Sequence, residues 1–263
     1  MSDKVCIVTG GTSGIGLAAA QALRKKGVRV YTVSRRALPE NPLHLSADIT
    51  DAGSVQRAVQ QVLAKEKTID ILVNCAGYGI SGAIEFTPEG QAKSQFDVNF
   101  FGLVNMTKEV IPVMRRQGYG RIVNISSVAA PAAIPFQAFY SASKAAINAY
   151  SCALANELRP YGVTVTAIQP GDIATGFTAA RNKIPDGDEA YGGRISKSVK
   201  KMENDEQNGM APAVAGEYIA VIALRKRVKP LYAIGFVYKA ICVLLKVLPS
   251  RLANYIIYLM YAK

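Results

Sequence analysis

The 263-residue sequence has a single histidine, His44, and this scarcity excludes whole classes of catalytic site. A metal site built from several histidines is excluded, and a serine–histidine–aspartate triad is disfavoured because His44 lies far in sequence from the candidate hydroxyls. The four cysteines, Cys6, Cys75, Cys152 and Cys242, form no C-x-x-C pair and stand in apolar surroundings. They are typical of reduced core residues and predict a cytoplasmic protein without a metal site.

Acidic residues are absent from Tyr218 to the end of the chain, where eight basic residues account for +8 of the net charge of +12. No motif that reads DNA or RNA accompanies these charges, so nucleic acid is not expected as a partner. No apolar run of signal-peptide length follows Met1, and no stretch reaches the roughly 18 to 20 apolar residues of a membrane span. The length suits one α/β domain with a sizeable core.

Short apolar stretches alternate with longer segments of helical periodicity. We expect strands at residues 5–9, 28–33, 43–47, 71–74, 121–125 and 163–168, and helices at 15–26, 52–65, 88–117 and 139–159. This alternation predicts an α/β fold: a single doubly wound parallel sheet with helices on both faces, in a domain that covers residues 1–235. From 172 to about 210 the sequence is rich in glycine and charge and predicts an irregular lid over the substrate, with a solvated insertion as the alternative.

A glycine-rich turn follows the first expected strand, in the run Thr9-Gly-Gly-Thr-Ser-Gly14-Ile-Gly16. Glycines allow the backbone to turn tightly and to approach a pyrophosphate, whose charge then lies at the N-terminus of the next helix. The spacing is G-x-x-x-G-x-G rather than the commoner G-x-G-x-x-G. The run predicts a dinucleotide phosphate site, and an ordinary glycine-rich turn is the alternative.

Tyr140 and Lys144 lie four residues apart in the expected helix, and Ser127 lies thirteen residues upstream of the tyrosine. The i, i+4 spacing places both side chains on one helical face, one turn apart. An ammonium next to a phenol favours the phenolate and lowers its pKa, and a shift from about 10 to 7 needs ~4 kcal/mol. The pattern predicts a proton-transferring tyrosine whose pKa is lowered by Lys144, beside a serine that holds the reacting oxygen.

Together these motifs resemble the short-chain dehydrogenase/reductase family over about residues 4 to 176. The resemblance rests on the glycine-rich run, Asn74-Cys-Ala-Gly77, Asn99, Ser127, Tyr140-x3-Lys144 and Pro170-Gly171. It implies a Rossmann fold, reversible hydride transfer to or from a nicotinamide, and a catalytic set of Asn99, Ser127, Tyr140 and Lys144. It also implies cofactor contacts from Gly10, Thr12, Ser13, Gly14, Ile15, Gly16, Ser34, Arg35, Arg36, Asp48, Ile49, Asn74, Ala76, Gly77, Tyr140, Lys144, Pro170, Gly171, Ile173 and Thr175.

The end of the second expected strand indicates which cofactor is bound. An acidic residue there pairs with the ribose hydroxyls of NAD, whereas an arginine accommodates the 2′-phosphate of NADP. Here Ser34 takes the acidic position and Arg35 and Arg36 follow it. Because guanidinium groups offer forked donors suited to phosphate, we expect NADP(H) to be preferred over NAD(H).

The substrate is expected to be hydrophobic. Ile134, Phe136 and Phe139 lie between Ser127 and Tyr140 and are expected to line an apolar pocket with them. A steroid, retinoid or lipid-like alcohol or ketone fits such a pocket, and the resemblance leans toward hydroxysteroid and retinol dehydrogenase-like members. The alternatives are a β-ketoacyl-type reductase and a non-catalytic NADP-sensing regulator. The resemblance also implies a homodimer or homotetramer.

Residues 236–263 form an unusual extension, with two apolar, basic stretches separated by Pro249. Their periodicity predicts two amphipathic helices. Three roles are open: the helices wall the substrate pocket, lie on an anionic membrane surface as a peripheral contact, or form a subunit interface.

Overall fold

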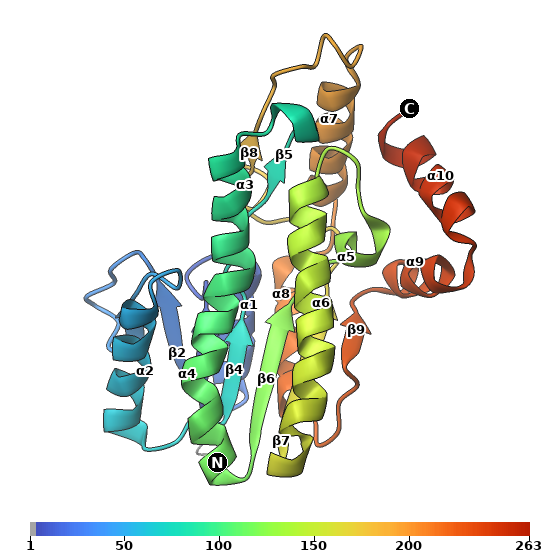
Figure 1. Ribbon diagram of the computed structural model, residues 1–263. Helices are drawn as coiled ribbons and strands as arrows, with labels where there is room; N and C mark the ends of the chain where they lie inside the picture. Colours follow the sequence, from blue (N-terminus) through green and yellow to red (C-terminus); the bar gives the residue numbers. More distant parts are fainter. Residues whose placement is uncertain (1–3) are drawn as a thin grey trace.

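A computed structural model describes residues 4–263 and centres on a seven-stranded sheet (Figure 1). The strand order is β3-β2-β1-β4-β6-β7-β9, and every pairing is parallel. The strands are β1 (Val5–Thr9), β2 (Arg29–Ser34), β3 (His44–Ser46), β4 (Ile71–Asn74), β6 (Gly120–Ile125), β7 (Val163–Gln169) and β9 (Leu231–Ala233). The order reverses between β1 and β4, and a ligand crevice opens at such a point outside the carboxyl ends of the strands.

Helices cover both faces of the sheet, because successive side chains along each strand point to opposite faces. Val5 and Ile7 of β1 pack with α2 (Ala52–Glu66), α4 (Gly102–Gln117) and α6 (Ala138–Leu158). Cys6 and Val8 pack on the other side, with α1 (Gly14–Lys25) and α8 (Pro212–Leu224). The predicted doubly wound parallel sheet is therefore confirmed. All four cysteines are free, and Cys6 and Cys242 are buried.

The helix expected over residues 88–117 is interrupted. Its first part is α3 (Glu89–Phe96), a π-helical turn η2 follows at Asp97–Phe101, and α4 continues the chain. A π turn is a rare local widening of the helix that often marks a functional position. Here it carries Asn99, which is buried. Three short elements complete the body: η1 (Ile84–Phe86), α5 (Ala129–Ala132) and η3 (Arg159–Tyr161).

The expectation of an irregular segment over residues 172–210 is wrong in two respects. A short strand, β8 (Asn182–Lys183), pairs in parallel with β5 (Ile80–Ser81), and the helix α7 spans Arg194–Gln207. The helix forms because its polar sequence still contains one apolar stripe: Ile195, Val199 and Met202 are buried on one side of it. Figure 1 shows α7 above the carboxyl end of the sheet, where it overhangs the crevice.

The C-terminal extension forms the two expected helices, α9 (Phe236–Val247) and α10 (Ser250–Tyr261). Their inner side packs on the body, where Cys242, Ala253 and Ile257 are buried. The Tyr238 hydroxyl donates a hydrogen bond to Asp172 Oδ2 at 2.6 Å and accepts one from the Asp172 N–H at 3.1 Å. Among residues 4–263, no helix is both long enough and apolar enough to span a bilayer.

Candidate active site

A cleft of about 1150 Å³ opens at the carboxyl edge of the sheet, where the strand order reverses. Loops that follow β1, β2, β4, β6 and β7 form one wall, and residues of α6, α7 and α10 form the other. This volume is slightly above the roughly 300 to 1,000 Å³ of typical small-ligand sites, which suits a dinucleotide together with a substrate.

The glycine-rich turn after β1 forms the floor of the cleft. The Thr9 hydroxyl accepts hydrogen bonds from the N–H groups of Cys75 and Ala76, at 3.0 and 3.2 Å, and so ties this turn to the loop after β4. Gly10 has a φ of +65°, and a Cβ there would lie 2.9 Å from the Ala76 Cα. A Cβ on Gly16 would lie 2.3 Å from the carbonyl oxygen of Gly10. Only glycine fits either position.

The N-terminus of α1 faces the same cleft. Ser13, Gly14 and Gly16 line it, and the Ser13 side chain makes no capping hydrogen bond. The N–H groups of the first helical turn have no intrahelical acceptor, so they favour an anion at this position. These residues therefore fit the pyrophosphate of a dinucleotide.

Helix α6 places Tyr140 and Lys144 in the cleft, one turn apart, as predicted. Lys144 is only 6% exposed. Its Nζ donates a hydrogen bond to the Ile125 carbonyl oxygen at 2.8 Å and lies 5.7 Å from the Tyr140 ring centroid. Ser127 is hydrogen-bonded to the Tyr140 phenol, and its Oγ accepts the Ala129 N–H at 3.0 Å. The three side chains thus meet in one place.

The electrostatics of this group differ from the sequence-based expectation. Burial raises the pKa of Tyr140 to about 12, although the hydrogen bond from Ser127 opposes the change. Burial also lowers the pKa of Lys144 to about 8. Without a bound nicotinamide the pKa of Tyr140 is thus raised, and the expectation that Lys144 and a cationic nicotinamide ring together lower it stays a prediction. Desolvation penalises the charged form of each group, and this effect outweighs their proximity.

Asn99 holds a loop over Lys144. Its Oδ1 accepts the Tyr78 N–H at 3.0 Å, and its Nδ2 donates to the Tyr78 carbonyl oxygen at 3.0 Å and to Ser143 Oγ at 3.1 Å. A Cβ on Gly77 would lie 3.0 Å from Asn99 Oδ1 and 3.6 Å from Lys144 Nζ. The side chain of Asn99 therefore holds residues 77 and 78 next to the ammonium group of Lys144.

At the far end of the cleft, Ser34 and Arg35 follow β2 and line the cavity. Asp48 also lines it, and hydrogen bonds from the N–H and hydroxyl of Thr50 lower the pKa of its carboxyl, with a smaller contribution from Arg35. Arg36 does not line the cleft: its side chain is exposed, and its carbonyl oxygen hydrogen-bonds to His44 Nε2 at 2.7 Å. The cofactor contact expected from Arg36 therefore stays a prediction.

The expected contact of the Asn74 side chain with the cofactor is a correction to the sequence analysis. Its side chain is 3% exposed and points into the core, where Nδ2 donates to Asn124 Oδ1 at 2.9 Å and to Thr107 Oγ1 at 3.1 Å. It does not line the cleft. The other expected cofactor residues do line it: Gly10, Thr12, Ser13, Gly14, Ile15, Gly16, Ser34, Arg35, Asp48, Ile49, Ala76, Gly77, Tyr140, Lys144, Pro170, Gly171, Ile173 and Thr175.

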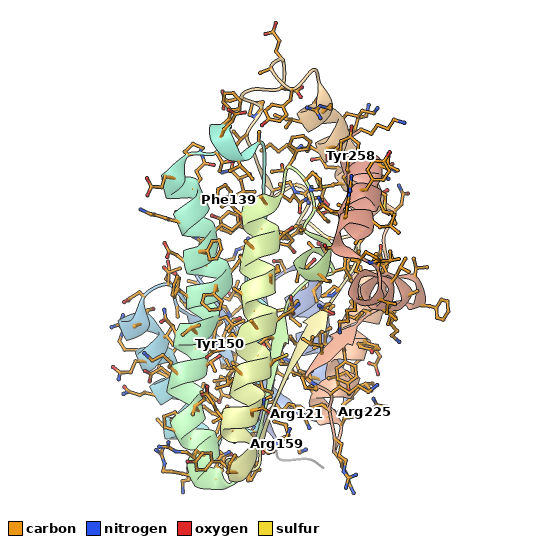
Figure 2. All side chains as sticks on the ribbon, turned by 45° about the vertical axis from the view of Figure 1, so that its right-hand side comes forward. Arg121, Phe139, Tyr150, Arg159, Arg225 and Tyr258 are labelled. Carbon is orange, nitrogen blue, oxygen red and sulfur yellow. The ribbon has the colours of Figure 1, made fainter. Side chains whose placement is uncertain are left out.

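The expected substrate pocket is only partly formed as predicted. Ile134 lines the cleft with Ser127 and Tyr140. Phe136 lines an adjacent hollow of about 480 Å³ instead, with its ring centroid 5.7 Å from that of Tyr191. Phe139 lines neither cavity, and Figure 2 shows it near the upper end of α6. In the turn before α6, Phe136 has a φ of +58°, a left-handed backbone conformation that the sequence analysis did not expect.

The geometry can therefore hold a dinucleotide and place a phenol, a hydroxyl and an ammonium at one end of it. A family model described as short chain dehydrogenase matches residues 4–185. The chain belongs to the short-chain dehydrogenase family. It is an oxidoreductase that acts on CH–OH or C=O groups with a nicotinamide cofactor.

Similar proteins agree with this assignment. The chain is 41% identical over 232 residues, 86% of each chain, to a 3-ketodihydrosphingosine reductase of Bacteroides thetaiotaomicron. It is 32% identical to a probable short-chain type dehydrogenase/reductase of Helicobacter pylori, over 94% of this chain and 93% of that one. The crystal structure of a short-chain dehydrogenase from Streptomyces avermitilis superposes with a TM-score of 0.84 at 29% identity and covers 98% of this chain and 97% of that one.

In this short-chain dehydrogenase, the sequence analysis expected a lid at residues 172–210 and left open that residues 236–263 wall the pocket, but it named none of the residues from these segments that line the cleft next to the substrate. Phe177 lies with its ring centroid 5.7 Å from that of Tyr140. Met202 and Glu206 come from α7, and Tyr261 from the end of α10. Glu206 forms an ion pair with the buried Arg181. Only the apolar stripe of α7 carries a sequence signal, since the other contacts depend on how distant segments fold together.

Proposed function

We propose that this short-chain dehydrogenase is an NADPH-dependent reductase of a ketone carried on a long apolar chain, of the 3-ketodihydrosphingosine type. The main support for this proposal is that Ser127, Tyr140 and Lys144 meet in one cleft. The apolar C-terminal extension helps to close this cleft through Tyr261. The 41% identity to a 3-ketodihydrosphingosine reductase supports the lipid ketone. Steroid and retinoid ketones are the competing substrates.

A bound nicotinamide supplies the hydride, and the residues of the chain supply position and the proton. Tyr140 donates its phenolic proton to the carbonyl oxygen as that oxygen becomes an alcohol. Burial raises the pKa of Tyr140 to about 12, so the phenol carries at neutral pH the proton that it donates. Ser127 holds the same oxygen by a hydrogen bond and orients it toward the phenol.

Lys144 positions the cofactor and restores the proton. One N–H of its ammonium is used on the Ile125 carbonyl, and two remain for the hydroxyls of a ribose. Asn99 is a positioning residue in this scheme, because it holds the loop at Gly77 beside Lys144. A water chain from Lys144 along this loop would return a proton to Tyr140 after each turnover.

The preference for NADP(H) is supported by the end of β2. Ser34 leaves no carboxylate there to accept ribose hydroxyls, and Arg35 lines the cleft where a 2′-phosphate would lie. One charge-assisted contact is worth about 1.5–3 kcal/mol, which corresponds to roughly a ten- to hundredfold preference. Equal or higher kcat/KM with NADH would refute it.

The experiment that tests the function follows NADPH absorbance with 3-ketodihydrosphingosine, a steroid ketone, a retinoid aldehyde and a short acyl ketone. We expect the sphingoid ketone to give the highest kcat/KM. Tyr140→Phe is expected to lose nearly all turnover while NADPH binding, measured by fluorescence, stays close to wild type. Turnover of more than a few per cent in Tyr140→Phe would exclude the proposed proton donor.

We also propose that residues 236–263 belong to the same domain as residues 1–235, and that the enzyme is a cytoplasmic homodimer or homotetramer. The packing of Tyr238 on Asp172 supports the first point. Light scattering on the purified full-length chain tests the assembly.

A further inference from the structure

The outer side of the C-terminal helices exposes an unusual number of large apolar side chains. Among the described residues, ten of the seventeen exposed large hydrophobic side chains lie between residues 236 and 260. We call them the outer face of α9 and α10: Phe236, Val237, Val243, Leu244, Val247, Leu252, Tyr255, Tyr258, Leu259 and Met260. Phe236 is 86% exposed and Val247 76%. An apolar patch of this kind marks an interaction surface.

The charged side chains that α9, α10 and the residues after them contribute to this face are all positive. Lys239, Lys246, Arg251 and Lys263 are exposed on or next to it, and the chain has no acidic residue after Glu217. Among the described residues, no ion pair involves any of these four. The basic residues near Arg225 do not contribute, because Figure 2 shows Arg225 toward the opposite end of the molecule from Tyr258.

We propose that the outer face of α9 and α10 docks on an anionic lipid bilayer. Each helix has 12 residues, too few to cross the roughly 30 Å hydrocarbon core, so both would lie in the interface with their apolar side chains inserted. Tyr255 and Tyr258 stack with ring centroids 6.1 Å apart, and aromatic rings of this kind favour the headgroup level. The ammonium and guanidinium groups pair with lipid phosphates and carboxylates.

The position of this face connects the bilayer to the active-site cleft. Figure 1 shows both helices at the outer edge of the molecule, beyond β9 and beside α7. Their inner side carries Tyr261, which lines the cleft, and Tyr238, which is bonded to Asp172 at the cleft wall. A lipid substrate drawn from the bilayer would therefore have only the thickness of these helices between it and the site.

A second copy of the chain is the less favourable occupant. In a two-fold symmetric contact the same surface meets itself, so Lys246 and Arg251 would approach like charges with no carboxylate from residues 218–263 to pair with them. A bilayer containing phosphatidylserine supplies the missing negative charge.

The test is flotation of the full-length protein with vesicles of phosphatidylcholine, with or without phosphatidylserine. We expect binding to the anionic vesicles and much weaker binding to the neutral ones. Lys246→Glu combined with Arg251→Glu should lower the partition coefficient by at least about 25-fold, roughly fivefold for each basic residue. Phe236→Ser combined with Val247→Ser should lower it by roughly tenfold or more, since the inserted apolar area is lost.

The matched control is Lys25→Glu combined with Lys65→Glu, which changes net charge equally on two exposed residues of α1 and α2. It should bind nearly as well as wild type. None of these six residues lines the cleft, so all variants should reduce a short water-soluble ketone at the wild-type rate. Equal loss in the control, or no flotation of the wild type, would overturn the proposal. The proposal would also be overturned if the wild type does not bind vesicles and the Phe236→Ser, Val247→Ser variant dissociates from dimer to monomer. In that case the outer face of α9 and α10 would be a subunit contact.

Discussion

Replacing Tyr238 by Phe removes one hydroxyl that joins the C-terminal helices to the active-site wall. This hydroxyl donates to Asp172 Oδ2 at 2.6 Å and accepts the Asp172 N–H at 3.1 Å. Burial raises the pKa of Asp172, and the Tyr238 hydrogen bond opposes that rise. The substitution should therefore raise this pKa further, because it leaves a partly buried carboxylate without its donor.

The size of the effect depends on pH. A carboxyl whose pKa is raised by folding costs stability at pH values above that pKa, and the cost disappears as the pH falls through it. At pH 7 the lost bond is to a charged group, and we expect about 1.5–3 kcal/mol of destabilisation, or about 4–8 °C in Tm. At a pH low enough to protonate Asp172, only a neutral bond is lost, and the difference should shrink to about 0.5–1.5 kcal/mol.

Urea denaturation at both pH values measures this difference, with Tyr255→Phe as the matched control. Tyr255 lies on the same extension but is 57% exposed, and its hydroxyl makes no hydrogen bond among the described residues, so removing that hydroxyl should change stability by less than about 0.5 kcal/mol. If Tyr238→Phe also falls within about 0.5 kcal/mol of wild type at pH 7, the extension does not depend on this contact. A destabilisation that is the same at both pH values would show that the carboxylate charge is not involved.

Three further predictions concern the cleft. Gly16→Ala should abolish NADPH binding in a fluorescence titration, because the new Cβ would lie 2.3 Å from the Gly10 carbonyl oxygen and the turn cannot give way. Arg35→Ser should lower the ratio of kcat/KM for NADPH to that for NADH by roughly 10- to 100-fold, whereas Arg36→Ser, outside the cleft, should leave it unchanged. Because burial lowers the pKa of Lys144 to about 8, kcat/KM for reduction should fall as the pH rises above 8 and the ammonium is lost; Lys144→Met should lack this decline.

The sequence predicts the central strands of the sheet best, because β1 and β4 are buried along their whole length. The expected strands at residues 5–9 and 71–74 match β1 and β4 at both ends, since each is an unbroken apolar run next to a turn. The helix α7 was missed because half of its residues are charged, and only Ile195, Val199 and Met202 reveal its buried side. The π turn at Asn99 has no sequence signal of this kind.

The site was predicted best where a residue's role depends on local backbone. The glycine-rich turn and the pair on α6 are set by short-range geometry, and they lie where expected. The prediction for Asn74 was wrong because the sequence does not show to which face of the sheet the last side chain of a strand points. Here the Asn74 side chain points into the core, where it donates a hydrogen bond to the buried amide oxygen of Asn124. Tyr261 could not be found, because its place in the cleft depends on the path of the whole C-terminal extension.

The Tyr140–Lys144 pair shows the limit of the spacing argument. Spacing correctly predicts that the ammonium lies near the ring, at 5.7 Å, but it contains no information about how much water surrounds the two groups. Both groups are buried, and burial disfavours the charged form of each. The pKa of Tyr140 is therefore raised, and the pKa of Lys144 is lowered. A protonated phenol can give its proton to a carbonyl oxygen but cannot remove one from an alcohol. Burial therefore keeps Tyr140 in the form that a proton donor needs, and additional positive charge beside the phenol, such as an oxidised nicotinamide ring, would favour the phenolate.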